Sequence, residues 1–320
     1  MEIKPYVIGL DLGGTNSVFG IVDADANIVA TTSLKTKGHQ SVEEYVQCCT
    51  KALAPLIEQV GGIDKIHGMG IGAPNGNFYT CNIEYAPNLE WKGIVPLARL
   101  FSEALGVNVV VTNDANAAAI GEMTYGAAKG MKNFIMITLG TGVGSGVVVN
   151  GDLVYGSDGF AGELGHVTVD YSEDARPCGC GNKGCLEAYC SATGVARTAR
   201  EILSKCNDES ELRNIPLENI TSKDVSIAAS HGDKIACEIY QFTGELLGRT
   251  CANFTPFSSP EAYIFFGGLT KAGDLLMNPI KSAYDAHVMK IFKGKAQMLF
   301  SKLDDAQAAV LGAAALAWKV

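Results

Sequence analysis

The first third of the chain consists of short apolar runs separated by glycine or polar residues, and of longer segments with apolar side chains at helical spacing. Apolar runs bounded by turn residues predict strands, and Ser41 with Glu44 three residues later forms a capping box that predicts the start of a helix. The pattern predicts strands over 6–10, 18–22, 28–32, 68–72 and 107–112, and helices over 41–60, 96–105 and 115–128. Strands and helices that alternate in this way are typical of an α/β protein.

The pattern of the opening hairpin returns in the middle of the chain. A strand is predicted over 135–139, a glycine turn follows, a second strand covers 146–149, and Asn150-Gly151 is a hairpin signal. When Leu12 is laid over Leu139, Gly13-Gly14-Thr15 falls on Gly140-Thr141-Gly142. Two unrelated hairpins also explain such a pair, but we interpret it as an internal duplication. It predicts two similar lobes, each with a glycine-rich hairpin at a central cleft.

The last third of the chain is richer in helices. Residues 235–250 are apolar at helical spacing, residues 262–266 form a predicted strand that leads into Gly267-Gly268, and a final helix is predicted from Asp304 or Asp305 to Ala317. This last helix is almost entirely Ala, Leu and Val, so we expect it to be buried against both lobes.

Composition places the protein among globular proteins that act on small molecules. The 320 residues are 47% hydrophobic and 18% charged, and the chain is long enough for two domains. The net charge is −9 and basic residues do not cluster, which argues against a nucleic-acid or membrane-surface partner. No apolar segment reaches the roughly 20 residues that span a bilayer, and no export signal is found, so a cytoplasmic location is expected. In the reducing cytosol, closely spaced cysteines are more typical of metal binding than of disulfides.

Three glycine turns that follow predicted strands are candidate nucleotide-binding loops. Glycine lacks the Cβ that keeps an anion away from backbone N–H groups, so a phosphate can approach such turns closely. Asp11, directly before the first turn, is placed to hold Mg²⁺ directly or through water. A tight β-hairpin without a ligand explains any one turn equally well, but three together favour a nucleotide. The turns are Gly13-Gly14-Thr15, Gly140-Thr141-Gly142-Val143-Gly144 and Gly267-Gly268.

Two common nucleotide motifs do not apply to this chain. It contains no G-x-x-x-x-G-K-[ST] sequence, which excludes a P-loop kinase. Gly68-Met69-Gly70-Ile71-Gly72-Ala73 matches the dinucleotide-binding pattern, but Pro74-Asn75-Gly76 stands where that motif requires a helix. We therefore interpret this match as accidental, and hydride transfer is not favoured.

His166, Cys178, Cys180 and Cys185 have the spacing of a metal site. Four N and S ligands with no open coordination position are typical of structural zinc, and the glycines between the cysteines let the backbone fold around an ion. A disulfide is the alternative, but Cys178 and Cys180 are poorly placed to pair with each other, and the lack of C-x-x-C argues against redox chemistry. A zinc-bound imidazole has its second nitrogen fixed in direction, so His166 is expected to face a substrate hydroxyl.

Three acidic residues are candidates for sugar binding and catalysis. Glu163 and Glu187 are close in sequence to the predicted zinc ligands, and rigid carboxylates suit the hydroxyls of a polyol. Asp114, within Asn113-Asp114-Ala115-Asn116, ends a predicted strand and begins a helix. Asp or Asn at such a position is commonly a helix N-cap. A carboxylate at the carboxyl end of a strand is also placed to accept the proton of an attacking hydroxyl, and both roles are compatible if Asn113 caps the helix.

Together these motifs resemble the ROK family (repressors, open reading frames and kinases), and within it the bacterial glucokinases. The resemblance covers almost the whole chain and implies an actin-like (ribonuclease H-like) ATPase fold, with nucleotide and sugar in the cleft between two lobes. Asn16 departs from the Lys or Arg common after D-x-G-G-T, so this position is assigned no role. The matching segments are D-x-G-G-T at 11–15, Gly72-Ala73-Pro74, and residues 86–89, 113–116, 138–144, 162–166 and 178–187.

The resemblance also implies roles for individual residues. Asp114 is implied as the catalytic base, and Thr15, Thr141 and Gly268 as nucleotide contacts beside the glycines of the three turns. The implied cofactors are ATP, Mg²⁺ and structural Zn²⁺, and a homodimer is a family expectation. The expected lobes are residues 1–116 with 303–320, and residues 117–302. The implied hexose contacts are Asn88, Asn113, Asp114, Glu163, His166 and Glu187.

These residues favour transfer of the ATP γ-phosphoryl group to the 6-hydroxyl of a hexose, glucose first, with Asp114 as general base. A kinase of the same family for an N-acetylhexosamine (GlcNAc or ManNAc), mannose or allose is the alternative, because one or two pocket side chains decide the sugar. A sugar-responsive transcriptional repressor is a more distant alternative. That subclass carries a helix-turn-helix ahead of the first strand, where only about five residues stand here.

Overall fold

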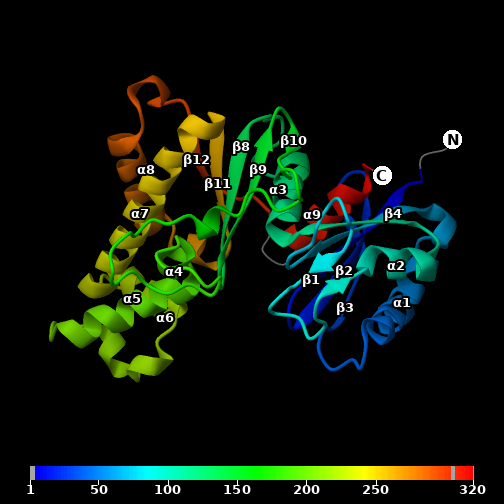
Figure 1. Cartoon of the computed structure of the whole chain (residues 1–320), viewed down its shortest axis with the longest axis horizontal. Coiled ribbons are helices and arrows are strands. Elements are labelled where there is room, and N and C mark those ends of the chain that lie inside the picture. The colour runs from blue at the N-terminus through cyan, green and yellow to red at the C-terminus, as the bar shows by residue number, and fades with distance from the viewer. Residues whose placement is uncertain (1–3, 304–306, 320) are drawn as a thin grey trace. The chain divides into compact units, whose positions relative to one another are not determined.

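The computed structural model describes residues 4–303 and 307–319, and the chain forms two compact units (Figure 1). The first unit comprises Met1–Gly130, Leu153–Gly162 and Lys302–Val320, and the second comprises Met131–Asp152 and Glu163–Ser301. These boundaries differ from the expected division after residue 116. Helix α3 (Asp114–Tyr125) belongs to the first unit because it packs on α9 (Ala308–Ala317). The short return at 153–162 was also not expected; there, Asn77 Nδ2 donates to the Asp158 carbonyl at 2.7 Å.

The first unit is built on a five-stranded sheet in the order β3-β2-β1-β4-β7. The first three strands form an antiparallel meander, and β4 and β7 add to β1 in parallel. The five strands predicted for this part of the chain are confirmed, four of them longer than expected and the last shifted by one residue at equal length. They are β1 (Tyr6–Leu12), β2 (Asn16–Asp23), β3 (Ile28–Lys35), β4 (Ile66–Ala73) and β7 (Asn108–Asn113). A separate pair, β5 (Ile83–Glu84) and β6 (Ile94–Val95), is antiparallel.

The alternation of side chains along β1 divides the first unit into two layers of helices. Ile8 and Leu10 are buried in a core with residues of α1 (Val42–Gln59) and α2 (Leu97–Leu105), whereas Val7 is buried with residues of α9. The predicted start of α1 is confirmed, since Ser41 Oγ accepts the N–H of Glu44 at 3.2 Å. The second bond of a capping box, from the N–H of Ser41 to the Glu44 carboxylate, is replaced by one from the N–H of Gln40.

Glycines let α9 lie directly on the sheet of the first unit. A Cβ on Gly9 would lie 2.2 Å from the Val310 carbonyl oxygen, and a Cβ on Gly70 would lie 1.9 Å from that of Ala313. The Gly70 of the accidental dinucleotide match therefore has a packing role. The predicted helix is confirmed over 308–317, while its expected start at Asp304 or Asp305 lies outside the described residues. The contacts of α9 with the sheet and with α3 lie within the first unit, and its expected burial against both lobes stays a prediction.

The sheet of the second unit repeats the plan of the first. Its order is β10-β9-β8-β11-β12, with β9 antiparallel to β8, and β11 and β12 added in parallel. β1 ends at Leu12 and β8 ends at Leu139, the two residues that the sequence repeat aligns. The internal duplication is thus reflected in strand order, direction and strand ends. The strands are β8 (Phe134–Leu139), β9 (Val143–Val149), β10 (Asp152–Leu153), β11 (Ala262–Phe266) and β12 (Gln297–Phe300).

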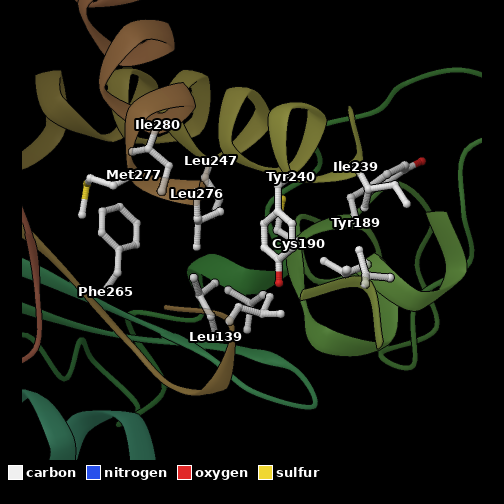
Figure 2. Close-up of a cluster of buried hydrophobic side chains, with 14 of the residues drawn as sticks. Leu139, Tyr189, Cys190, Ile239, Tyr240, Leu247, Phe265, Leu276, Met277 and Ile280 are labelled. Atoms are coloured by element: carbon white, nitrogen blue, oxygen red, sulfur yellow. The ribbon is translucent and has the colours of Figure 1, made fainter. Parts of the chain in front are cut away.

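Helices cover the second sheet and enclose a hydrophobic core with it. Figure 2 shows Leu139 and Phe265 of the sheet facing Leu247 of α7 (Lys234–Ser258) and Met277 of α8 (Asp274–His287). The helix predicted over 235–250 is confirmed as part of α7, whereas the other helices of this unit were not predicted. They are α4 (Glu187–Cys190), α5 (Ala192–Lys205), α6 (Ser222–Ser230) and α8. None of the helices among the described residues is long and apolar enough to cross a membrane.

Candidate functional site

Two carboxyl groups lie at the carboxyl ends of β1 and β7, the strands on either side of β4 in the first unit. Asp11 of β1 pairs with Gly72 of β4, Gly72 pairs with Thr112 of β7, and Asp114 follows β7 as the first residue of α3. The absence of a side chain at Gly72 leaves room for α3, because a Cβ there would lie 3.6 Å from the Asp114 Cα and 3.0 Å from the Ala117 Cβ. The structure therefore places the predicted base near the predicted magnesium ligand.

Both carboxyl groups are held in surroundings that disfavour their charged forms. Burial, and secondarily the charge of Asp114, raises the pKa of Asp11 to about 6. Asp114 is exposed to solvent as a residue, but the protein packed around its carboxylate desolvates it and so raises its pKa. Carboxylates with raised pKa values that lie close together are characteristic of functional sites.

At the start of α3, the residue before Asp114 is the N-cap of the helix. Asn113 is the N-cap, and its Oδ1 accepts the N–H of Ala115 at 2.8 Å. Asp114 Oδ1 accepts the same N–H at 2.8 Å. Asn113 therefore caps the helix. This is the condition under which the position is compatible with a catalytic role for Asp114.

The first glycine turn combines the hairpin with close packing. The N–H of Gly13 donates to the Asn16 carbonyl at 3.0 Å, so this donor is used within the turn. A Cβ on Gly14 would lie 3.0 Å from the Asn88 carbonyl oxygen. Gly14 therefore lets the turn approach Asn88, which brings a predicted nucleotide loop beside a predicted hexose contact.

The second glycine turn (Gly140–Gly144) is fastened to the segment that contains α4 and the start of α5. These contacts were not predicted from the sequence. The one local signal is Ser191, a typical N-cap residue that marks the start of α5: its Oγ accepts the N–H of Gly194 at 3.0 Å. A pocket of about 270 Å³ lies beside the turn and is lined in part by Thr141, Thr193 and Arg197. The joining hydrogen bonds are Ala192 N–H to the Gly140 carbonyl (2.8 Å), Thr193 Oγ1 to the Thr141 carbonyl (2.5 Å) and Val143 N–H to Glu187 Oε2 (2.9 Å).

The third glycine turn lies against the end of β8. Gly267 has φ of 106°, and a Cβ there would lie 2.6 Å from the Leu139 carbonyl oxygen, so the backbone conformation and the packing both require glycine. A Cβ on Gly268 would meet no described atom within 4 Å. The fold thus explains the glycine at position 267, whereas Gly268 has open space beside it.

The four predicted metal ligands form one compact cluster in the second unit. The ligand atoms of His166, Cys178, Cys180 and Cys185 all lie within 4.8 Å of one another. His166 Nδ1 is 3.6 Å from Cys178 Sγ, and the Sγ atoms of Cys180 and Cys185 are 3.6 Å apart. A tetrahedral zinc ion with ordinary bond lengths separates its ligands by about 3.6 Å for an N–S pair and about 3.8 Å for an S–S pair. The cysteines are free thiols, so the set fits a zinc ion rather than a disulfide.

The loop that carries the cysteines is held in shape by glycine and by a buried cation. Gly184 has φ of 76°, and a Cβ there would lie 2.0 Å from the Asp170 carbonyl oxygen. Arg176 is buried directly before the loop, and its guanidinium donates to the Ala188 carbonyl at 3.1 Å and to Glu201 at 2.6 Å. These contacts fix the entry and exit of the loop and so position its thiols.

Two glutamates extend the metal-ligand cluster. Glu163 Oε2 is 4.0 Å from His166 Nε2, the nitrogen that does not face the cysteines. Glu187 Oε1 is 3.6 Å from Cys178 Sγ. The structure therefore groups Glu163, His166 and Glu187 within the second unit, and Asn88, Asn113 and Asp114 belong to the first unit.

Comparison with known proteins agrees with this arrangement. The ROK family model matches residues 7–320. The chain is 36% identical to the glucokinase of Halalkalibacterium halodurans over 89% of this chain and 86% of the relative, and 34% identical to the glucokinase of Thermotoga maritima over 98% and 97%. A crystal structure of a ROK family glucokinase from Streptomyces griseus in complex with glucose and AMPPNP superposes with a TM-score of 0.81 at 32% identity, covering 98% of this chain and 100% of that one. The expected actin-like α/β fold with duplicated lobes is confirmed, and the chain belongs to the ROK family.

Proposed function

We propose that the protein is an ATP-dependent hexose kinase that phosphorylates the 6-hydroxyl of its sugar, with glucose as the preferred substrate. The observation that carries this proposal is the pair of interacting carboxyl groups, Asp11 and Asp114, at the ends of the two strands that flank β4, beside a glycine turn. The relatives named glucokinase and the Streptomyces griseus enzyme that binds glucose and AMPPNP support the reaction class.

In this mechanism Asp114 is the general base. Its carboxylate accepts the proton of the 6-hydroxyl while the oxygen attacks the γ-phosphorus, and the bond to the ADP leaving group breaks. A raised pKa suits this role, because it makes the carboxylate a stronger base than an ordinary aspartate. Asn113 keeps Asp114 oriented by sharing the N–H of Ala115.

Asp11 is the residue we assign to Mg²⁺, directly or through water. Its pKa is raised in part by the neighbouring charge of Asp114, and such a site is stabilised by a cation. Bound Mg²⁺ supplies positive charge that offsets the phosphate oxygens of ATP. The nucleotide is assigned to the three glycine turns, with Gly13, Gly14, Thr15, Gly140, Thr141, Gly142, Gly267 and Gly268.

We assign the hexose to Asn88, Asn113 and Asp114 of the first unit, and to Glu163, His166 and Glu187 of the second. The cluster of His166 with the three cysteines is assigned to one structural zinc ion, since four ligands at tetrahedral spacing leave no open position. Zinc would hold the imidazole through Nδ1 and leave Nε2 toward Glu163 and the sugar. A homodimer is proposed from the family expectation, and light scattering in solution tests it.

A coupled assay of ADP release over a panel of hexoses tests the proposal. We expect the highest kcat/KM for glucose and lower values for mannose, allose, N-acetylglucosamine and N-acetylmannosamine. Asp114→Ala should abolish turnover, whereas Asp64→Ala, an exposed aspartate of the same unit, should keep it. A higher kcat/KM for an N-acetylated sugar would reassign the substrate, and turnover that survives in Asp114→Ala would reject the assigned base.

A further inference from the structure

The carboxylate of Glu187 is held from two sides within the second unit. Its Oε2 accepts the N–H of Val143 in the second glycine turn at 2.9 Å, and its Oε1 is 3.6 Å from Cys178 Sγ. A residue that served the hexose alone would have no need for a bond to the backbone of this turn. Glu187 therefore links the metal-ligand cluster to a predicted nucleotide loop.

The second glycine turn is shaped around this carboxylate. A Cβ on Gly142 would lie 2.3 Å from Glu187 Oε2, far inside van der Waals contact, whereas a Cβ on Gly140 would meet no described atom within 4 Å. A side chain at Gly142 would thus displace the Glu187 carboxylate from its place beside the turn. The turn and the carboxylate fit each other closely.

We propose that Glu187 is a positioning residue for the nucleotide: its Oε2 fixes the second glycine turn through Val143, and its Oε1 serves the hexose. This inference rests on the proposed function. A thiolate that binds zinc has no proton to donate, so in the metal-bound protein Oε1 is available to a substrate hydroxyl. One carboxylate then joins both ligands, and each ligand should raise the affinity for the other.

A double-mutant cycle on Gly142 and Glu187 tests the link. The measured quantity is the dissociation constant of AMPPNP by calorimetry, with Mg²⁺ and without hexose. Glu187→Ala should weaken AMPPNP binding about tenfold, the effect of one hydrogen bond to a charged group. Gly142→Ala should weaken it in the wild-type background but add little to Glu187→Ala, because the clash is then gone. Gly140→Ala is the matched control, and its effect should be the same in both backgrounds.

Two further measurements separate positioning from general damage. The amide of Val143 should exchange faster with solvent in Glu187→Ala than in wild type, while in Glu163→Ala, a glutamate assigned to the hexose alone, it should not change. The zinc content of both variants should equal that of wild type, since neither glutamate belongs to the metal-ligand set.

The outcomes distinguish this inference from the proposed function. Unchanged AMPPNP affinity and unchanged Val143 exchange in Glu187→Ala, or additive effects of Gly142→Ala and Glu187→Ala, would overturn the positioning role even if glucose is phosphorylated. A wild-type protein that phosphorylates no hexose would refute the proposed function, while the coupled loss of AMPPNP binding would still support the link between Glu187 and the turn.

Discussion

Replacement of Asp11 by asparagine should stabilise the protein at neutral pH and not at acid pH. The pKa of Asp11 is raised by burial and by Asp114 from its ordinary value of 3.8 to about 6. The folded protein therefore binds the Asp11 proton more tightly than the unfolded chain does. Its contribution to stability is fully present below pH 3.8 and is lost as the pH rises through about 6. At neutral pH the ionised carboxylate is a cost that the neutral amide of asparagine avoids.

The size of the effect follows from the difference between the two pKa values of Asp11. A change from 3.8 to about 6 corresponds to about 3 kcal/mol of unfolding free energy at pH 7.5. For a unit of this size, about 3 kcal/mol raises the melting temperature by about 6 to 12 °C. The gain should shrink when Asp114→Asn is already present, because part of the Asp11 shift comes from Asp114.

The assay is calorimetric melting of wild type and Asp11→Asn between pH 4 and pH 8, without nucleotide or Mg²⁺. Asp23→Asn is the matched control in the neighbouring strand. The pKa of Asp23 is lowered by hydrogen bonds from Asn27 and Asp25 that outweigh its slight burial, so its variant should lose stability toward neutral pH. A lower melting temperature for Asp11→Asn at pH 7.5, or a gain that persists unchanged at pH 4, would refute the reasoning.

Three further predictions concern catalysis, packing and the metal. Asp114→Asn should lower kcat at least about 100-fold with a smaller change in KM. In wild type, kcat/KM should fall as the pH is lowered, because the raised pKa values of Asp11 and Asp114 bring their protonation closer to neutral pH. Steady-state kinetics measure both effects. Gly70→Ala should lower the free energy of unfolding by about 3 kcal/mol or more, because the added Cβ meets a backbone oxygen. Gly20→Ala should lower it by less, because that Cβ meets the Val310 side chain at 2.6 Å, and a side chain can move. Equal melting temperatures for the two variants would contradict this. The purified protein should contain one zinc ion per chain by mass spectrometry, and Cys180→Ser should lose it together with hexose affinity; a wild type without metal would reject the zinc site.

The sequence was most informative where its signal is local or repeated. Strand ends and turns follow from glycine and β-branched runs, so β1, β4, β7 and β8 could be predicted. The overlay of the two glycine turns predicted the duplication, and in the structure both strands end at the aligned residues Leu12 and Leu139. The metal-ligand cluster was also predictable, since three cysteines and a histidine with glycines between them have few other uses.

The sequence did not reveal contacts made across long separations. The bond from Val143 to Glu187 joins residues in different elements, and no local pattern marks Glu187 as a partner of the turn. The compact units differ from the expected division for the same reason: α3 follows β7 directly, but its membership in the first unit depends on packing against α9 near the C-terminus. Such partners become visible only when both elements are placed.

The two copies of the hairpin obtain their carboxylate in different ways. In the first unit Asp11 lies within β1 itself, directly before the turn. Laying Leu12 over Leu139 puts Thr138 in the place of Asp11, and the Thr138 hydroxyl accepts the N–H of Gly144 at 3.1 Å. The carboxylate beside the second turn comes instead from Glu187, next to the metal-ligand cluster. The two copies thus share the hairpin and a glycine turn, whereas the acidic group belongs to the first strand in one copy and to α4 in the other. In the proposed function, Asp11 at the first turn is assigned to the cation and Glu187 at the second to the sugar, so the two copies of the hairpin are assigned to two parts of one reaction.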